Sequence, residues 1–279
     1  MGIILQILSV VSFSLGNVLW KLFHVKSNIF TIISKRSFIT ALLFLVAVLI
    51  SDSWQATLFK PYLTAIALSI ISFWGLYFYN LSIRILKAGQ TTTVTGLTSF
   101  FGVVTSIIVY QESFNITLIF VSLLIVSGLF LIEDKFTFKW SKGTLYAIIA
   151  AFIWGTTFAL FKIPVEQIGS LQFSFVLECC VFVESALIVL FSKNKSNYKL
   201  SKKELIIVAL LAITTFSGVL LYNLSVTKAP VSVISLISAS GPATALLFAH
   251  LFYKETYSFK QYIGMGLIFV SVFLLAYLF

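Results

Sequence analysis

Tyr79-Asn80-Leu81-Ser82 recurs 143 positions later as Tyr222-Asn223-Leu224-Ser225, and this repetition decides how the chain folds. The same offset places Tyr110-Gln111-Glu112 on Tyr253-Lys254-Glu255, with no gap between the two matches. Two matches in one register are hard to obtain by chance, so we infer that the chain contains an internal duplication.

The correspondence also reaches the beginning of each half. An offset of 139 aligns Phe13-Ser14-Leu15-Gly16 with Phe152-Ile153-Trp154-Gly155. The repeat therefore covers most of the chain, and we place its two copies at residues 3–133 and 143–279.

The composition places both copies in a lipid bilayer. Of the 279 residues, 59% are hydrophobic and 10% are charged, against about 45–50% and about 25% in a soluble domain. This balance excludes an ordinary soluble enzyme. Apolar runs long enough for spanning helices cover 3–22, 29–50, 61–82, 89–110, 115–132, 143–162, 171–192, 205–226, 230–251 and 259–278. Because these runs show no polar–apolar alternation, they favour helices over a β-barrel. We expect an all-α integral membrane protein with ten transmembrane helices in two five-helix repeats.

An odd number of crossings in each copy requires the second copy to enter the membrane from the opposite side. The two repeats are therefore expected to be inverted. Most basic residues outside the spans lie in the connections after spans 1, 3, 5, 7 and 9. The connections on the opposite side of the membrane hold only Lys60, Lys162 and Lys228. The positive-inside rule then predicts that both termini lie outside. Most of the 19 Lys and Arg lie between apolar runs and form no aromatic-interleaved stripe, so the net charge of +10 indicates a membrane surface rather than nucleic acid.

With these features the chain resembles the EamA-type family of the drug/metabolite transporter superfamily. The matching residues are the Trp-Gly pattern in Phe152–Phe158, Arg36 followed by Ala41, Asn223-Leu224-Ser225 with Ala229 and Pro242, and the loop acids Glu112 and Glu255. The first copy departs from the pattern, since Leu15-Gly16-Asn17 lacks the Trp and Ser99 stands in place of the Pro.

The resemblance implies ten helices in two inverted repeats and a multi-pass transporter of small organic compounds. Substrates across the family include amino acids, other metabolites and toxic organic compounds. Family members commonly have cytoplasmic termini, whereas the charge distribution here predicts that both termini lie outside.

Arg36 and Glu178 are the most informative candidates for a site, because an offset of 142 places opposite charges at equivalent positions. Flanking a central cavity, they would bind the carboxylate and the ammonium of an amino acid, and Glu178 would accept a proton. Alternatively, Arg36 extends to the headgroups and Glu178 is satisfied by a neighbouring helix. Glu184 lies about 240° further around the same helix, so only one of the two glutamates is expected to face the pathway.

The other candidate substrate-binding residues are polar or aromatic side chains at matched positions or beside them, together with one proline. They are Asn17, Trp20, Trp74, Tyr79, Asn80, Trp154, Thr156, Tyr222, Asn223 and Pro242. Helix packing is the alternative for the asparagines. The hydroxyl-rich runs 91–99 and 232–240 are assigned to tight helix packing, and Pro242 is expected to permit a kink.

These features predict transport by alternating access, with proton coupling or exchange. Export of amino acids or related metabolites is the first expectation, and export of toxic lipophilic or cationic compounds is the alternative. Neither an HExxH motif nor a phosphate-binding loop occurs, so we expect no enzyme, no cofactor and no metal. The expected partners are a small-molecule substrate and the bilayer, with a monomer in the cytoplasmic membrane of a prokaryote.

Overall fold

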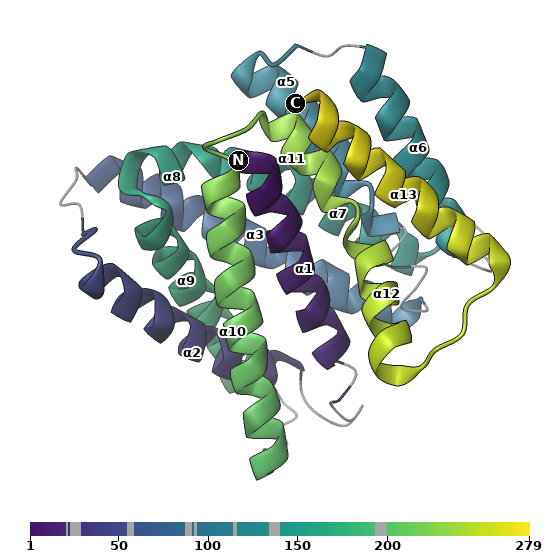
Figure 1. Cartoon of the computed structure of the whole chain (residues 1–279). Helices are drawn as coiled ribbons and strands as arrows, with labels where there is room; N and C mark the ends of the chain where they lie inside the picture. The colour runs from purple at the N-terminus through teal and green to yellow at the C-terminus, as the bar shows by residue number, and fades with distance from the viewer. Residues whose placement is uncertain are drawn as a thin grey trace.

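The computed structural model of the chain describes residues 1–20, 22, 29–54, 59–86, 91, 94–113, 116–133, 140–192 and 200–279, and contains no strand among them. The helices are α1 (Gly2–Trp20), α2 (Ile29–Ile50), α3 (Phe59–Ile85), α5 (Thr98–Tyr110), α6 (Ile116–Ile132), α7 (Lys142–Leu160), α8 (Lys162–Ile168), α9 (Ser170–Phe191), α10 (Lys202–Ser225), α11 (Val231–Ser238), α12 (Gly241–Tyr253) and α13 (Phe259–Leu278). They form one bundle, and both termini lie at the same end of it (Figure 1).

Eight segments among the described residues are long and apolar enough to cross a membrane, when α7 with α8 and α11 with α12 are each counted as one. The remaining two predicted spans contain α5 and α6, which are apolar but shorter, with 13 and 17 residues. The all-helical membrane character predicted from the sequence is therefore confirmed. The crossing of the bilayer by α5 and α6 stays a prediction.

Helices of the two halves begin at positions that share the offset found in the sequence. α3 begins at Phe59 and α10 at Lys202, while α6 begins at Ile116 and α13 at Phe259, so that each pair is 143 positions apart. Ser201 and Ser258 cap α10 and α13 through capping boxes, which satisfy amide groups that have no partner inside the helix.

α2 and α9 hold equivalent places in the two halves and pack against each other in opposite directions. Phe44, near the end of α2, lies in one apolar cluster with Phe173, near the start of α9. Ile33, near the start of α2, lies in another cluster with Val181, further along α9. Antiparallel contact between equivalent helices is the arrangement that an inverted duplication requires.

The fourth and ninth predicted spans are both interrupted. A turn at Ala239 and Ser240 separates α11 from α12, and a turn at Gly96 and Leu97 precedes α5. Pro242 stands at the beginning of α12, where its missing N–H costs least. The first half has the same interruption without a proline, so the break does not depend on Pro242 alone.

Polar side chains lie inside the bundle and large apolar side chains cover its outside. Gln6, Ser9, Asn223 and Ser271 are buried, whereas many Phe, Leu and Ile side chains are exposed. This distribution suits a bundle surrounded by lipid, because polar groups in a bilayer must find partners within the protein.

α6 and α13 form a second antiparallel contact between equivalent helices, and two glycines allow it. A methyl group added at Gly264 would lie 2.7 Å from the Gly128 carbonyl oxygen and 2.9 Å from the Ile132 amide nitrogen. Gly266, two residues further along α13, has no atom within 4 Å of the same position. The backbones of α6 and α13 can therefore approach this closely only if residue 264 is a glycine.

We expect Gly264→Ala to lower the free energy of unfolding by about 1–3 kcal/mol, because the added methyl group forces the two backbones apart. Gly266→Ala is the matched control and should cause no loss. Unfolding of both purified variants in detergent micelles measures the difference. Equal stabilities would show that α6 and α13 do not make this contact.

Candidate functional site

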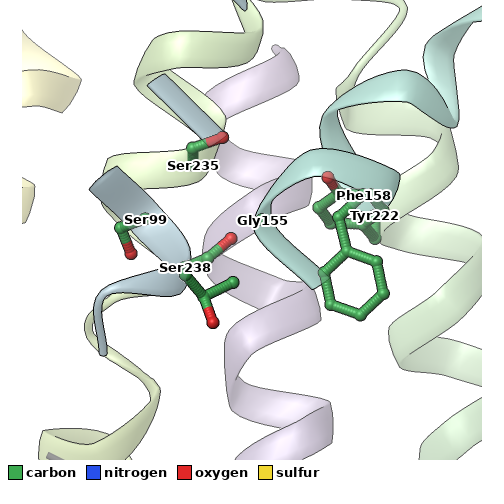
Figure 2. Close-up of a pocket in the computed structure, with 7 residues that line it drawn as sticks. Ser99, Gly155, Phe158, Tyr222, Ser235 and Ser238 are labelled. Carbon is green, nitrogen blue, oxygen red and sulfur yellow. The ribbon is translucent and has the colours of Figure 1, made fainter. Parts of the chain in front are cut away.

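A small cavity lies where α5, α7, α10 and α11 meet (Figure 2). It is lined by Thr98, Ser99, Gly155, Phe158, Tyr222, Ser235 and Ser238. Its volume is about 20 Å³, which is room for about one water molecule. The helices thus surround a small space whose lining is mostly apolar and includes five hydroxyl groups.

Of the five lining hydroxyl groups, those of Thr98, Ser99, Tyr222 and Ser235 form no hydrogen bond within the described part of the chain. Among these, Ser99 and Ser235 are each 7% exposed. Ser238, by contrast, accepts a hydrogen bond from Gln6 Nε2 at 2.8 Å and donates one to the Ile234 carbonyl at 3.0 Å. Because buried hydroxyls normally have partners, the free ones suit a polar ligand.

The ends of two helices add to the polarity of the cavity. α5 begins at the lining residue Thr98, and α11 ends at the lining residue Ser238. The first turn of a helix presents N–H groups and partial positive charge, and its last turn presents carbonyls and partial negative charge. None of the residues that line the cavity is charged. Part of these groups is already paired, since the Ser99 amide donates to the Gly96 carbonyl and the Ala239 amide to the Leu236 carbonyl. The helix ends therefore contribute partial charge to the site, positive on the α5 side and negative on the α11 side.

Three of the predicted aromatic residues, together with Phe158, form a continuous row that reaches the cavity. Tyr79 packs against Trp154 with ring centroids 5.3 Å apart, Trp154 stacks on Phe158 at 6.1 Å, and Phe158 contacts Tyr222 at 5.9 Å. The Trp154 Nε1 group donates to the Ser72 carbonyl at 3.1 Å. Of the predicted residues, only Tyr222 lines the cavity, while Tyr79 and Trp154 lie behind Phe158.

Arg36 and Glu178 are brought together, but away from this cavity. Arg36 Nη1 lies 3.3 Å from Glu178 Oε1, and Arg36 Nη2 donates to Ser37 Oγ at 2.6 Å. The two charged side chains are 10% and 4% exposed. They neutralise one another where α2 crosses α9, and their role in substrate binding stays a prediction.

Two of the three predicted asparagines, Asn80 and Asn223, have different partners. Asn80 Nδ2 donates to the Leu76 carbonyl of its own helix at 2.8 Å. Asn223 Nδ2 donates to Ser174 Oγ at 2.8 Å and so joins α10 to α9. The Asn223 Oδ1 and Glu178 Oε2 atoms are both buried without a hydrogen-bond partner.

The remaining predicted residues do not line the cavity. Asn17 is exposed, Thr156 is partly buried, and Trp74 is 47% exposed and packs edge-on against Tyr77. Trp20 packs at the edge of two apolar clusters. Pro242 marks the start of α12.

The residues that supply most of the cavity's polarity are not among the predicted binding residues. Thr98, Ser99, Ser235 and Ser238 belong to the hydroxyl-rich runs for which the sequence predicts helix packing. The signal that distinguishes them is the interruption of both spans beside these runs, since broken spans expose helix ends where transporters bind substrates. Phe158 and Gly155 could have been identified as lining residues, because Gly155 follows Trp154 in the sequence and Phe158 lies one helical turn further along.

Comparison with known proteins gives a family and a fold. The model of a family described as the EamA-like transporter family matches residues 1–133 and again residues 141–277. No curated protein matches the chain in sequence. A solved structure described only as "Crystal structure of protein" superimposes with a TM-score of 0.80 at 16% identity, covering 99% of this chain and 96% of the other. At that identity the likeness concerns the fold alone.

The pairing of Arg36 with Glu178 predicts a specific pattern of stability. Arg36→Met should lower the free energy of unfolding by about 3–5 kcal/mol, because it leaves a carboxylate buried without a cation. The double variant Arg36→Met/Glu178→Met should recover most of the loss. Unfolding in detergent micelles measures both. An equal or larger loss in the double variant would contradict the mutual neutralisation.

Proposed function

The chain belongs to the EamA-like transporter family of multi-pass membrane transporters, and we propose that it moves small organic metabolites by alternating access through the cavity between α5, α7, α10 and α11. The observation that carries this proposal is the pair of buried, unpartnered hydroxyls of Ser99 and Ser235 at the ends of interrupted helices. Transporter sites of this kind lie near mid-membrane, where broken helices present backbone groups to the substrate.

We further propose that the ten predicted spans form two inverted repeats, with the boundaries expected from the sequence. The shared helix starts and the antiparallel contact of α2 with α9 support this arrangement. Inverted repeats give two states of similar energy that are related by exchanging the conformations of the halves. A monomer in the cytoplasmic membrane would suffice for this cycle.

A zwitterionic amino acid is the proposed substrate class. The positive end of α5 and its Ser99 hydroxyl suit a carboxylate, and the carbonyl end of α11 suits an ammonium group. The alternative is a lipophilic or cationic toxic compound, for which Phe158 and Tyr222 would supply the aromatic surface. No carboxylate lines the cavity, and this favours the zwitterion.

Exchange in proteoliposomes tests the substrate class, with pooled amino acids in one arm and lipophilic cations in the other. Wild-type protein should exchange amino acids. Ser99→Ala and Ser235→Ala should each weaken exchange about tenfold, because a hydrogen bond to a charged group is lost. Ser122→Ala is the matched control, since Ser122 donates to Leu118 within α6. Movement of the cations alone would replace the amino-acid assignment with the toxic-compound alternative.

For a proton-coupled cycle we propose Glu184 as the proton carrier in place of Glu178. Glu178 is neutralised by Arg36. Glu184 forms no ion pair or hydrogen bond within the described residues, and its Oε2 atom is buried. A lone ionised carboxylate in a bilayer is costly, which favours a protonated form that can exchange its proton when the surrounding helices move.

Glu184→Gln should abolish accumulation driven by a pH gradient and leave substrate exchange intact, because exchange needs no net proton movement. Glu166→Gln is the matched control and should leave accumulation unchanged. The Glu166 carboxylate is half-exposed, and its Oε1 atom lies 3.8 Å from Lys162 Nζ. Uptake of the exchanged substrate with and without the gradient provides the measurement. Retained accumulation in Glu184→Gln would exclude this residue as the carrier.

A further inference from the structure

The repeated motif Tyr-x-Glu makes the same first contact in both halves. Tyr110, the last residue of α5, donates its hydroxyl hydrogen to the Ala159 carbonyl at 2.9 Å, in the last turn of α7. Tyr253, the last residue of α12, donates to the Val18 carbonyl at 3.1 Å, in the last turn of α1. Each tyrosine therefore ties the end of one helix to the end of another.

The middle residue of each motif turns the chain sharply. Gln111 has φ 53° and Lys254 has φ 55°, the left-handed conformation that side chains rarely adopt. Holding two non-glycine residues in this conformation costs energy. The same left-handed turn therefore follows both tyrosines and sets the direction of the chain at the glutamate that comes next.

In the first motif this glutamate holds the start of α11. Glu112 Oε1 accepts a hydrogen bond from the Val231 amide at 2.7 Å. Glu112 Oε2 accepts from the Ser232 amide at 2.9 Å and from its hydroxyl at 2.6 Å. A carboxylate at the positive end of a helix makes strong, charge-assisted bonds. In the second motif, Glu255 Oε2 accepts from Tyr257, and the positions equivalent to Val231 and Ser232 lie outside the described residues.

The two motifs lie at opposite ends of the bundle. Gly2, at the start of α1, packs against Lys228 and Ala229, which directly precede the helix start held by Glu112. Val18, which Tyr253 contacts, lies sixteen residues further along α1, or about 24 Å at 1.5 Å per residue. Figure 1 shows the end of α5 and the end of α12 on opposite sides.

We propose that Tyr110-Gln111-Glu112 and Tyr253-Lys254-Glu255 are two clamps, each of which closes the cavity toward one face of the membrane. The first clamp joins α5 to α7 and to α11, three of the four helices that line the cavity. Opening that face separates these helices and so requires the first clamp to break. The second clamp acts on α12 and α1 at the other face. This inference rests on the proposed alternating access.

Thiol accessibility tests the clamps without any substrate. Ser235→Cys in a Cys179→Ala/Cys180→Ala background places one reporter thiol in the cavity. Sealed vesicles of one orientation are treated with a membrane-impermeant thiol reagent from one side at a time. Tyr110→Phe and Tyr253→Phe make the same chemical change at the two faces, and both keep the aromatic ring.

We expect each variant to raise the labelling rate about two- to tenfold from its own face, the shift that loss of one hydrogen bond produces. Tyr110→Phe should act from the face that holds residue 1, and Tyr253→Phe from the opposite face. Glu112→Gln should act in the same direction as Tyr110→Phe and more strongly. Tyr277→Phe, an exposed position on α13, is the control and should change neither rate.

Unchanged rates, or the same change from both faces in both variants, would overturn the proposal and leave the tyrosines a packing role only. The free energy of unfolding of each variant, measured in micelles, shows whether the variant still folds. A variant that folds stably but labels faster has lost the clamp and not the fold. Because the readout is labelling, a protein that moves no tested substrate can still confirm the clamps. A protein that transports but shows no face-specific labelling refutes them alone.

Discussion

Inside a bilayer there is no water to satisfy polar groups, and every donor and acceptor must find its partner in the protein. Most of the buried polar side chains meet this constraint by bonding to nearby carbonyls, as Ser69 and Ser185 do within their own helices. Gln6 meets it across helices, since it donates to Ser238 and accepts from Ser225. Ser99 and Ser235 differ from the other buried hydroxyls without partners among the described residues, such as those of Ser72 and Thr105, because their side chains line the cavity.

The interruptions of the fourth and ninth spans depend on the same constraint. An interrupted helix loses regular backbone hydrogen bonds, which in a bilayer must be replaced within the protein. At the first break the Leu97 amide donates to the Val94 carbonyl, and at the second the Ser240 amide donates to the Ile237 carbonyl. Ala239 and Ser240 at the second break are buried, and the cavity begins beside both breaks. The cost of breaking two helices is thus incurred where their ends can face a substrate.

Much of the fold can be predicted from the sequence, because apolar runs and charged connections report directly on membrane crossings. The run 29–50 coincides with α2, and 171–192 differs from α9 by one residue at each end. The predicted run 143–162 ends one residue beyond the division at Phe161. The short helix α8 that follows escapes prediction, since Lys162, Pro164 and Glu166 interrupt the apolar pattern. Arg36 and Glu178 are identifiable as a related pair, but their mutual contact follows only once α2 and α9 are known to touch. Ser99 and Ser235 resemble ordinary packing residues until the helix breaks show what they face.

The Arg36–Glu178 contact also bears on how such a chain arises. Equivalent helices meet at this point, so two identical five-helix chains assembled in opposite orientations would place the same residue against itself. Two buried arginines or two buried glutamates would repel each other, and a complementary pair cannot form between identical copies. Joining both copies in one gene removes that restriction, because each half can then change independently. The ion pair therefore requires the two halves to differ at this position, and it makes each half dependent on the other.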